Sequence, residues 1–330
     1  MTPLRRWVAV LVACAAGSLV TGCDDSAPGP PPSSAPATDR QVHERPDKPA
    51  DPQPSAPPLT RTFTAPRTAA ELAARLVTDE DLARAPGTAG DLRDAAAFEA
   101  QLLYRQLART PTWEHRVRLL VPGRYRADLA DHLTARRSLR SVLTTLSDEV
   151  PAWEILEPAP TADLRRFYRE GERRYGVAWE VLAAVNLVES GFGKIRGLST
   201  AGAQGPMQFI PSTWAAYGDG DVDDPHDAIL GAAHYLAANG GGTGALAGPD
   251  VAGALLRYNN AQGYVDGILA YAAILHRDPR ALGELVRWQI VYLSTIGDLW
   301  LPIGYRSTTP VPVATYVRQH PERLLGTRTD

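Results

Sequence analysis

Apolar residues recur every three or four positions through most of the chain after residue 67, and this spacing predicts amphipathic helices. The helices predicted in this way run from residue 68 onward and over 91–108, 125–146 (where the pattern allows a break), 162–175, 178–189, 212–217, 224–238, 249–258 and 263–276. The fold class predicted from this pattern is mainly α.

Several of these helices carry recognisable start and stop signals. Thr68 followed by Glu71 forms a capping box, in which each side chain can satisfy a free backbone N–H. Gly176 is a plausible C-terminal stop for the helix before it. Asp224 is a good N-cap, and Pro225 suits the first helical position because its missing N–H costs nothing there.

The tail after residue 277 has a different pattern. Residues 288–293 and 299–303 are apolar and aromatic, and they flank Gly297-Asp298. This arrangement predicts a short β-hairpin, and the proline at 302 favours an edge position for its strand. Residues 278–330 are therefore expected to form a C-terminal hairpin and tail.

The N-terminus has the features of a secretory signal. Arg5 and Arg6 precede a short apolar run, which ends in small residues before Cys23. This sequence resembles the lipobox of bacterial lipoproteins, in which residues 1–22 are removed and the new N-terminal cysteine is lipidated. An ordinary secreted protein with an incidental Cys23 is the alternative. Lipidation is favoured because Cys14 leaves with the signal, so the mature chain has no second cysteine for a disulfide.

Residues 23–60 predict a disordered tether. Eleven of the 37 residues after Cys23 are proline, with Ser, Ala and Asp between them, and such a segment cannot bury enough apolar surface to fold. Residues 61–160 then form a helical N-terminal extension in which no catalytic grouping is recognisable. The net charge of −3 argues against a nucleic-acid partner, whose binding is driven by phosphate contacts.

The candidate chemistry centres on Glu189, at the end of the helix predicted over 178–189. Val181, Val185 and Val188 share one face of that helix, and Glu189 falls on the same face. Desolvation there disfavours the charged carboxylate and raises its pKa, as a general acid requires. The alternative is a solvated or ion-paired surface carboxylate, which is the usual state of a glutamate at a helix end.

Three short motifs follow one another around this glutamate. They are Glu189-Ser190, Gly205-Pro206-Met207-Gln208 and Tyr258-Asn259. In order and approximate spacing they resemble the soluble lytic transglycosylase family, whose fold is related to goose-type lysozyme. The resemblance covers roughly residues 160–277 and is nearest to membrane-anchored bacterial members, which also share the helix start at 224–229. It implies a lysozyme-like helical catalytic domain over residues 161–277.

The resemblance also implies an activity and a set of site residues. Members cleave the β-1,4 bond between N-acetylmuramic acid and N-acetylglucosamine in peptidoglycan without consuming water. Glu189 would protonate the leaving oxygen and then act as the base that closes a 1,6-anhydro ring. The residues expected to contact or support the sugar are Gln208, Tyr258, Ser199, Asn259 and Phe209. Pro206, where many members have Leu, is expected to stiffen its loop.

The expected protein is thus exported, anchored to the outer face of the cell membrane through Cys23, and acts on glycan strands without a cofactor or metal. Two alternatives stay open: a hydrolysing muramidase, with a second carboxylate from the acidic run 219–224, and a glycan-binding lipoprotein without activity. A calcium loop in that run fails because Asp224 and Leu230 occupy the positions that need Gly and Glu. The histidines are scattered, and nothing implies a His partner for Ser190.

Overall fold

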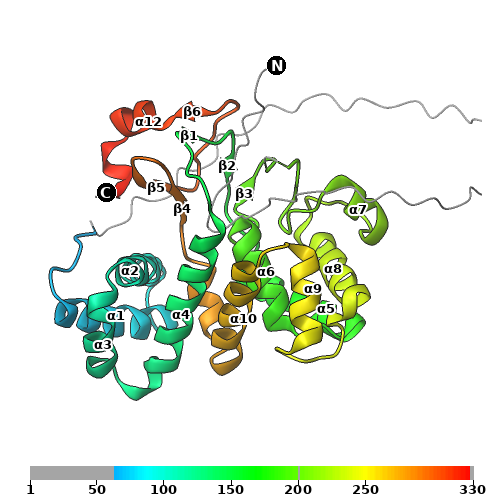
Figure 1. Cartoon of the computed structure of the whole chain (residues 1–330), viewed down its shortest axis with the longest axis horizontal. Coiled ribbons are helices and arrows are strands. Elements are labelled where there is room, and N and C mark those ends of the chain that lie inside the picture. Colours follow the sequence, from blue (N-terminus) through cyan, green and yellow to red (C-terminus); the bar gives the residue numbers. More distant parts are fainter. Residues whose placement is uncertain (1–62, 200, 328–330) are drawn as a thin grey trace, which may run out of the picture.

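The computed structural model describes residues 63–199 and 201–327. The predicted signal peptide and the whole of the predicted tether, Cys23 included, lie outside these residues. Helices dominate the described part, as the periodicity predicts. The first four are α1 (Ala69–Arg84), α2 (Gly90–Arg109), α3 (Pro111–Leu120) and α4 (Gly123–Val142). In Figure 1 they form a group on one side of the molecule.

The later helices surround a central pair, α6 (Trp179–Ser190) and α10 (Gln262–Arg277). Figure 1 shows the N-terminal group on one side of this pair and α5, α8 and α9 on the other. These and the remaining helices are α5 (Thr161–Tyr175), α7 (Pro211–Tyr217), α8 (Pro225–Leu236), α9 (Pro249–Tyr258), α11 (Ala281–Leu285) and α12 (Val313–Gln319). Every residue of α6 is buried, so this helix is the centre of the helical part.

The local signals in the sequence produce the predicted helix ends. The Thr68 hydroxyl accepts from the Glu71 N–H at 3.1 Å. Gly176 ends α5 with a left-handed φ of 69°. Asp224 accepts from the backbone N–H groups of His226 and Asp227 at the start of α8. These three predictions are confirmed. Helices α3, α11 and α12 were not predicted, and neither was the π-helical turn over Ala237–Gly241 that continues α8.

The predicted C-terminal hairpin is present as β4 (Ile290–Leu293) and β5 (Gly297–Leu301), which pair antiparallel. The expected edge position is wrong, because β5 lies between β4 and β7 (Leu324–Thr327). Proline 302 follows the last paired residue of β5, so it removes no hydrogen bond from the sheet. Two further pairs of two-residue strands complete the upper part: β1 (Glu149–Val150) with β6 (Val311–Pro312), and β2 (Glu154–Ile155) with β3 (Ile195–Arg196).

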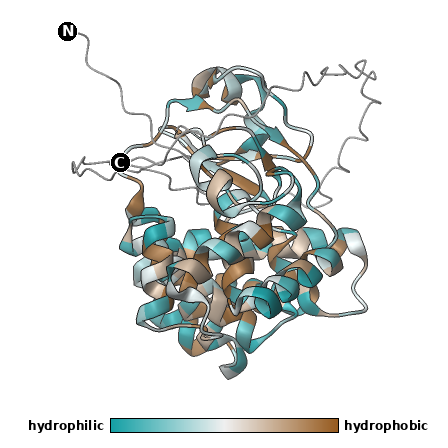
Figure 2. Cartoon of the chain, turned by 90° about the vertical axis from the view of Figure 1, so that its right-hand side faces the viewer, coloured by the Kyte–Doolittle hydropathy of each residue, from teal (hydrophilic) through white to brown (hydrophobic). Residues whose placement is uncertain are grey.

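One hydrophobic core joins the N-terminal helices to the rest of the helical part, from Leu72 in α1 to Trp288 before β4. Figure 2 shows both hydrophobic and hydrophilic residues along these helices, as expected for amphipathic segments packed in layers. Helix α4 packs closely on α10, where a Cβ on Gly267 would lie 2.5 Å from Leu139. Residues 63–160 therefore share a core with the helix that faces Glu189.

Candidate active site

Glu189 occupies the second-last position of α6 and is 4% exposed. The hydroxyl of Tyr264, near the start of α10, donates to Glu189 Oε1 at 2.6 Å. Burial raises the pKa of Glu189 to about 8, and the Tyr264 hydrogen bond opposes that rise. The predicted desolvation is confirmed, and the alternative of a solvated surface carboxylate is wrong. At neutral pH this carboxyl holds a proton, which is the state of a general acid.

Ser190 follows Glu189 and holds the neighbouring loop. Its hydroxyl donates to the Pro206 carbonyl at 2.5 Å and accepts from the Gly193 N–H at 2.8 Å. The Asn186 side-chain amide donates to the same Pro206 carbonyl at 2.9 Å. Because the Ser190 proton is directed at a carbonyl, the hydroxyl is placed for positioning and not for nucleophilic attack.

The Gly205–Gln208 segment is a tight turn. The backbone groups of Gln204 and Phe209 exchange two hydrogen bonds across its base, at 3.0 and 2.9 Å. Gly205 has φ 74°, and a Cβ there would lie 2.0 Å from the Val222 carbonyl oxygen. Gln208 adopts φ 51°, a region that residues other than glycine rarely enter. The left-handed conformation of Gln208 is therefore strained, and contacts with the surrounding residues keep the turn in this shape.

Two residues expected to position the sugar contact this turn. The Gln208 side-chain amide donates to the Gly205 carbonyl at 3.0 Å. The Tyr258 hydroxyl donates to the Met207 carbonyl at 2.7 Å. The rings of Tyr258 and Tyr264 are stacked, with centroids 6.4 Å apart and an angle of 6° between their planes. Tyr258 therefore lies next to Tyr264, the partner of Glu189, and it also contacts the turn that contains Gln208.

The three other expected contact residues have different surroundings. The Ser199 hydroxyl accepts from the N–H groups of Ala201 and Ala203, so it organises the loop before the turn. Asn259 is half-buried at the end of α9. Phe209 is 3% exposed and packs against Trp214 with ring centroids 5.2 Å apart. Phe209 supports the turn from the core side, which differs from the expected contact with substrate.

The acidic run after α7 builds a turn and a helix cap. Asp224 caps α8, and the Asp227 carboxylate accepts from the Asp221 N–H at 3.0 Å. His226 lies between the Asp227 and Glu170 carboxylates, at 3.1 and 3.2 Å. The capping role expected for Asp224 is confirmed. Within the run, backbone N–H groups engage the Asp221 and Asp224 carboxylates and Arg196 pairs with Asp223 at 2.9 Å, so these residues have a structural explanation.

A second acidic grouping, buried between α1, α4 and α11, joins Glu80, Glu284 and His132. Arg84 bridges the two carboxylates, with nitrogen–oxygen distances of 2.7 Å to each. Burial raises the pKa of Glu80 and lowers that of His132. A guanidinium already supplies the positive charge that a metal ion would bring, so this grouping is explained as a buried ion pair beside a neutral histidine.

Sequence reasoning missed two of the residues that shape the site. Nothing in the three motifs singles out Tyr264, yet its hydroxyl donates to Glu189, which lies 75 residues earlier in the sequence. Asn186 lies one helical turn before Ser190 and accepts from the Tyr168 hydroxyl at 2.7 Å. The i, i+4 spacing of Asn186 and Ser190 is a usable signal, because it places both side chains on one face of α6.

These features together define a class of protein: a mainly helical, lysozyme-like domain in which one buried carboxyl lies beside two stacked tyrosines and a tight turn. Comparison with known proteins agrees, because residues 166–277 match the model of the transglycosylase SLT domain. This part of the chain is similar to that family.

The chain is also similar to a membrane-bound lytic murein transglycosylase F from Thiobacillus denitrificans, with 31% identity over 139 residues. The matched stretch is 42% of this chain and 29% of that relative, so the chain spans less than a third of the relative's length. No solved structure matches the chain.

Proposed function

We propose that this protein is a peptidoglycan lytic transglycosylase, which cleaves the β-1,4 bond between N-acetylmuramic acid and N-acetylglucosamine and leaves a 1,6-anhydro end. The observation that carries the proposal is the Glu189 carboxyl, protonated at neutral pH by burial and held at its Oε1 atom by Tyr264. The SLT domain match over residues 166–277 supports the same reaction class.

In the first step, Glu189 gives its proton to the glycosidic oxygen as the bond from that oxygen to C1 of the muramic sugar breaks. The positive charge that develops at C1 is taken up by the carbonyl oxygen of the sugar's own N-acetyl group, which bonds to C1. Substrate-assisted glycosidases need only one protein carboxyl for this reason. Tyr264 supports the step because its hydrogen bond stabilises the carboxylate that remains.

In the second step, the Glu189 carboxylate takes the proton of the C6 hydroxyl of the same sugar. The C6 oxygen then bonds to C1, the N-acetyl oxygen leaves C1, and the anhydro ring is closed. Glu189 is protonated again and no water is consumed. Gln208, Tyr258 and Asn259 would orient the sugar in both steps. Ser190 and Ser199 support the loop that carries Gln208, because Ser190 donates to the Pro206 carbonyl and Ser199 accepts from the Ala203 N–H.

Mass spectrometry of the products from purified wall glycan tests the reaction. Anhydro ends support the proposal, reducing ends would indicate a hydrolysing muramidase, and the absence of products would indicate a binding protein. Glu189→Gln keeps the side-chain shape but cannot deliver the proton, so we expect turnover to fall by about 10² to 10⁴ while glycan binding is retained. Substantial residual cleavage would place the acid elsewhere.

We also infer that the protein is held at the cell membrane by a lipid on Cys23. The lipobox-like sequence before Cys23 supports this, and the similar relative is named as membrane-bound. Within residues 63–199 and 201–327, no helix has the length and apolar character to cross a bilayer. Cys23→Ala should release the protein from the membrane fraction or leave its signal uncut. A correctly processed variant that still sediments with membranes would refute lipidation.

A further inference from the structure

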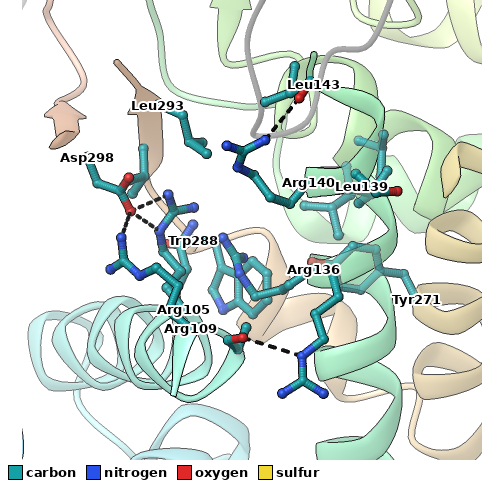
Figure 3. A pocket seen from close by; sticks show the side chains of 17 residues that line it. Arg105, Arg109, Arg136, Leu139, Arg140, Leu143, Tyr271, Trp288, Leu293 and Asp298 are labelled. Atoms are coloured by element: carbon teal, nitrogen blue, oxygen red, sulfur yellow. Dashed lines mark hydrogen bonds and ion pairs between the residues drawn. The ribbon is translucent and has the colours of Figure 1, made fainter. Parts of the chain in front are cut away.

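A cavity of about 480 Å³ lies between the N-terminal helices, the central pair α6 and α10, and the C-terminal sheet. Five arginines line it, two from α2 and three from α4: Arg105, Arg109, Arg136, Arg137 and Arg140. Asp298 is the acidic residue in the lining (Figure 3). The walls are otherwise largely apolar, formed by side chains such as Leu143, Val188, Trp288 and Leu293. The cavity therefore combines a strong excess of positive charge with an apolar interior.

Most of these arginines already have partners. Arg105 and Arg109 both bond to Asp298, at 2.6 and 3.1 Å. Arg137 pairs with Glu114 outside the cavity at 2.7 Å. Arg140 donates to a backbone carbonyl, that of Leu143, at 3.0 Å. These contacts hold the guanidinium groups in place, but they leave the total positive charge of the lining largely unbalanced.

Neither Arg136 nor Arg140 forms an ion pair with any of the residues that the structure describes, and Arg136 differs from Arg140 because it is partly buried and Arg140 is exposed. Figure 3 shows it in the middle of the cavity, close to Trp288 and Tyr271. The Tyr271 hydroxyl, which burial keeps neutral, forms a hydrogen bond with Arg136. Desolvation and the nearby Arg105 lower the pKa of Arg136 to about 9. A guanidinium held this way is costly unless an anion joins it.

The cavity adjoins the helix that carries Glu189. Val188 is part of its lining and is bonded to Glu189, so their Cα atoms are about 3.8 Å apart. Ser141, also in the lining, packs against Gly263, the residue before Tyr264. A ligand in the cavity would therefore lie against both elements that hold the Glu189–Tyr264 pair.

We propose that this cavity binds the carboxylate-bearing peptide that is attached to the muramic sugar of the substrate, with Arg136 pairing with a carboxylate. This assignment rests on the proposed function, because it places the peptide of the same strand beside Glu189. The planar guanidinium matches a carboxylate in two parallel hydrogen bonds. Arg-to-phosphate pairing has the same geometry, but the apolar walls suit methyl and methylene groups of a peptide better than a phosphate polymer.

Cleavage selectivity tests the proposal with the full chain. The substrates are glycan strands with their peptides and the same strands stripped by an amidase. We expect Arg136→Gln to lower the preference for peptide-bearing strands, measured as the ratio of the two kcat/KM values, by about tenfold, as expected for one lost charge-assisted hydrogen bond. Arg116→Gln is the matched control, since Arg116 is an exposed arginine of α3 outside the cavity, and it should keep the ratio.

A direct binding measurement uses full-length Glu189→Gln and a tetrapeptide with free carboxylates. We expect binding that weakens about tenfold when the carboxylates are amidated, and equally when Arg136→Gln is added. If wild type cleaves both strands and Arg136→Gln keeps the preference, the peptide assignment is wrong and the proposed function stands. If wild type cleaves neither, the proposed function fails and the tetrapeptide result alone decides. Displacement of the tetrapeptide by millimolar inorganic phosphate would instead assign the cavity to phosphate.

Discussion

The Tyr264 hydroxyl donates a hydrogen bond of 2.6 Å to the Glu189 carboxyl, and the buried surroundings of that carboxyl favour its protonated form. Burial raises the pKa of Glu189 to about 8, and this hydrogen bond works in the opposite direction because it stabilises the charged form. A group that must release a proton and later recover it needs both influences. The pair therefore supports the proposed use of one carboxyl as acid and then as base.

Tyr264→Phe should raise the pKa of Glu189 above its present value, because it removes the hydrogen bond that lowers that pKa. Activity needs protonated Glu189 in the free enzyme, so it should fall as pH rises through about 8 in wild type and at a higher pH in the variant. The pH profile of kcat/KM measures this shift. Tyr235→Phe, which removes a hydroxyl that donates to the Arg257 carbonyl, is the control. An unmoved alkaline limb in Tyr264→Phe would contradict the assignment.

The buried carboxyl also predicts a pH-dependent stability. The folded-state pKa of about 8 exceeds the ordinary value of 4.5. The stability contributed by the neutral side chain is thus complete below pH 4.5 and is lost as pH rises towards and through 8. The loss approaches about 1.4 kcal/mol for each pH unit within that window. Glu189→Gln stays neutral, so its free energy of unfolding should exceed that of wild type increasingly from pH 5 to 8.

Urea unfolding at several pH values measures this difference. Glu322→Gln, on the surface, controls for the change in net charge. A gap between Glu189→Gln and wild type that is constant with pH would show that the Glu189 carboxyl is not desolvated.

Two glycines of the site loop form a matched pair for testing the turn. Gly202 and Gly205 both have left-handed φ values, of 77° and 74°. A Cβ on Gly202 would meet nothing within 4 Å, whereas one on Gly205 would lie 2.0 Å from the Val222 carbonyl oxygen. Gly202→Ala should cost only the conformational term of about 1 kcal/mol. Gly205→Ala should cost more and displace Gln208, with loss of activity. Equal melting temperatures and activities would show that the close approach is unimportant.

Substitutions in the acidic run 219–224 distinguish a transglycosylase from a two-carboxylate muramidase. Asp219→Asn and Asp221→Asn should reduce activity only modestly if Glu189 works alone. Asp224→Asn should also be mild because Asn caps a helix nearly as well, whereas Asp224→Ala should cost about 0.5–2 kcal/mol. Initial rates and thermal unfolding measure these effects. A 10²-fold drop at Asp219 or Asp221 in folded protein, with reducing ends among the products, would indicate a two-carboxylate muramidase.

Most of the helical architecture could be predicted because its signals are local. The Thr68 capping box, the Gly176 stop and the Asp224 cap each depend on residues within a single turn of helix. The burial of Glu189 could be predicted for the same reason, since helical periodicity places it on an apolar face. The two-residue strands could not, because pairs such as Glu149 with Pro312 carry no periodic pattern and depend on contacts between distant segments.

The site was predicted only in part, because some of its contacts follow from local sequence and others depend on contacts between distant segments. The order of the motifs predicted that Glu189, the turn and Tyr258 belong to one site. It did not predict the hydrogen bond between Tyr264 and Glu189, because that bond depends on the packing of α6 against α10. Phe209 was misjudged because an aromatic residue beside a motif has the same sequence signature whether it faces the core or the solvent.

The packing of α4 against α10 has a genetic consequence. Gly263 and Gly267 sit against Ser141 and Leu139 of α4, so the position of Tyr264 depends on residues that precede the matched family region and carry no chemistry of their own. A bulkier side chain at Ser141 would push on the first turn of α10 and move the partner of the acid. Such an allele would have the phenotype of an active-site mutant, although its lesion lies in the N-terminal helices.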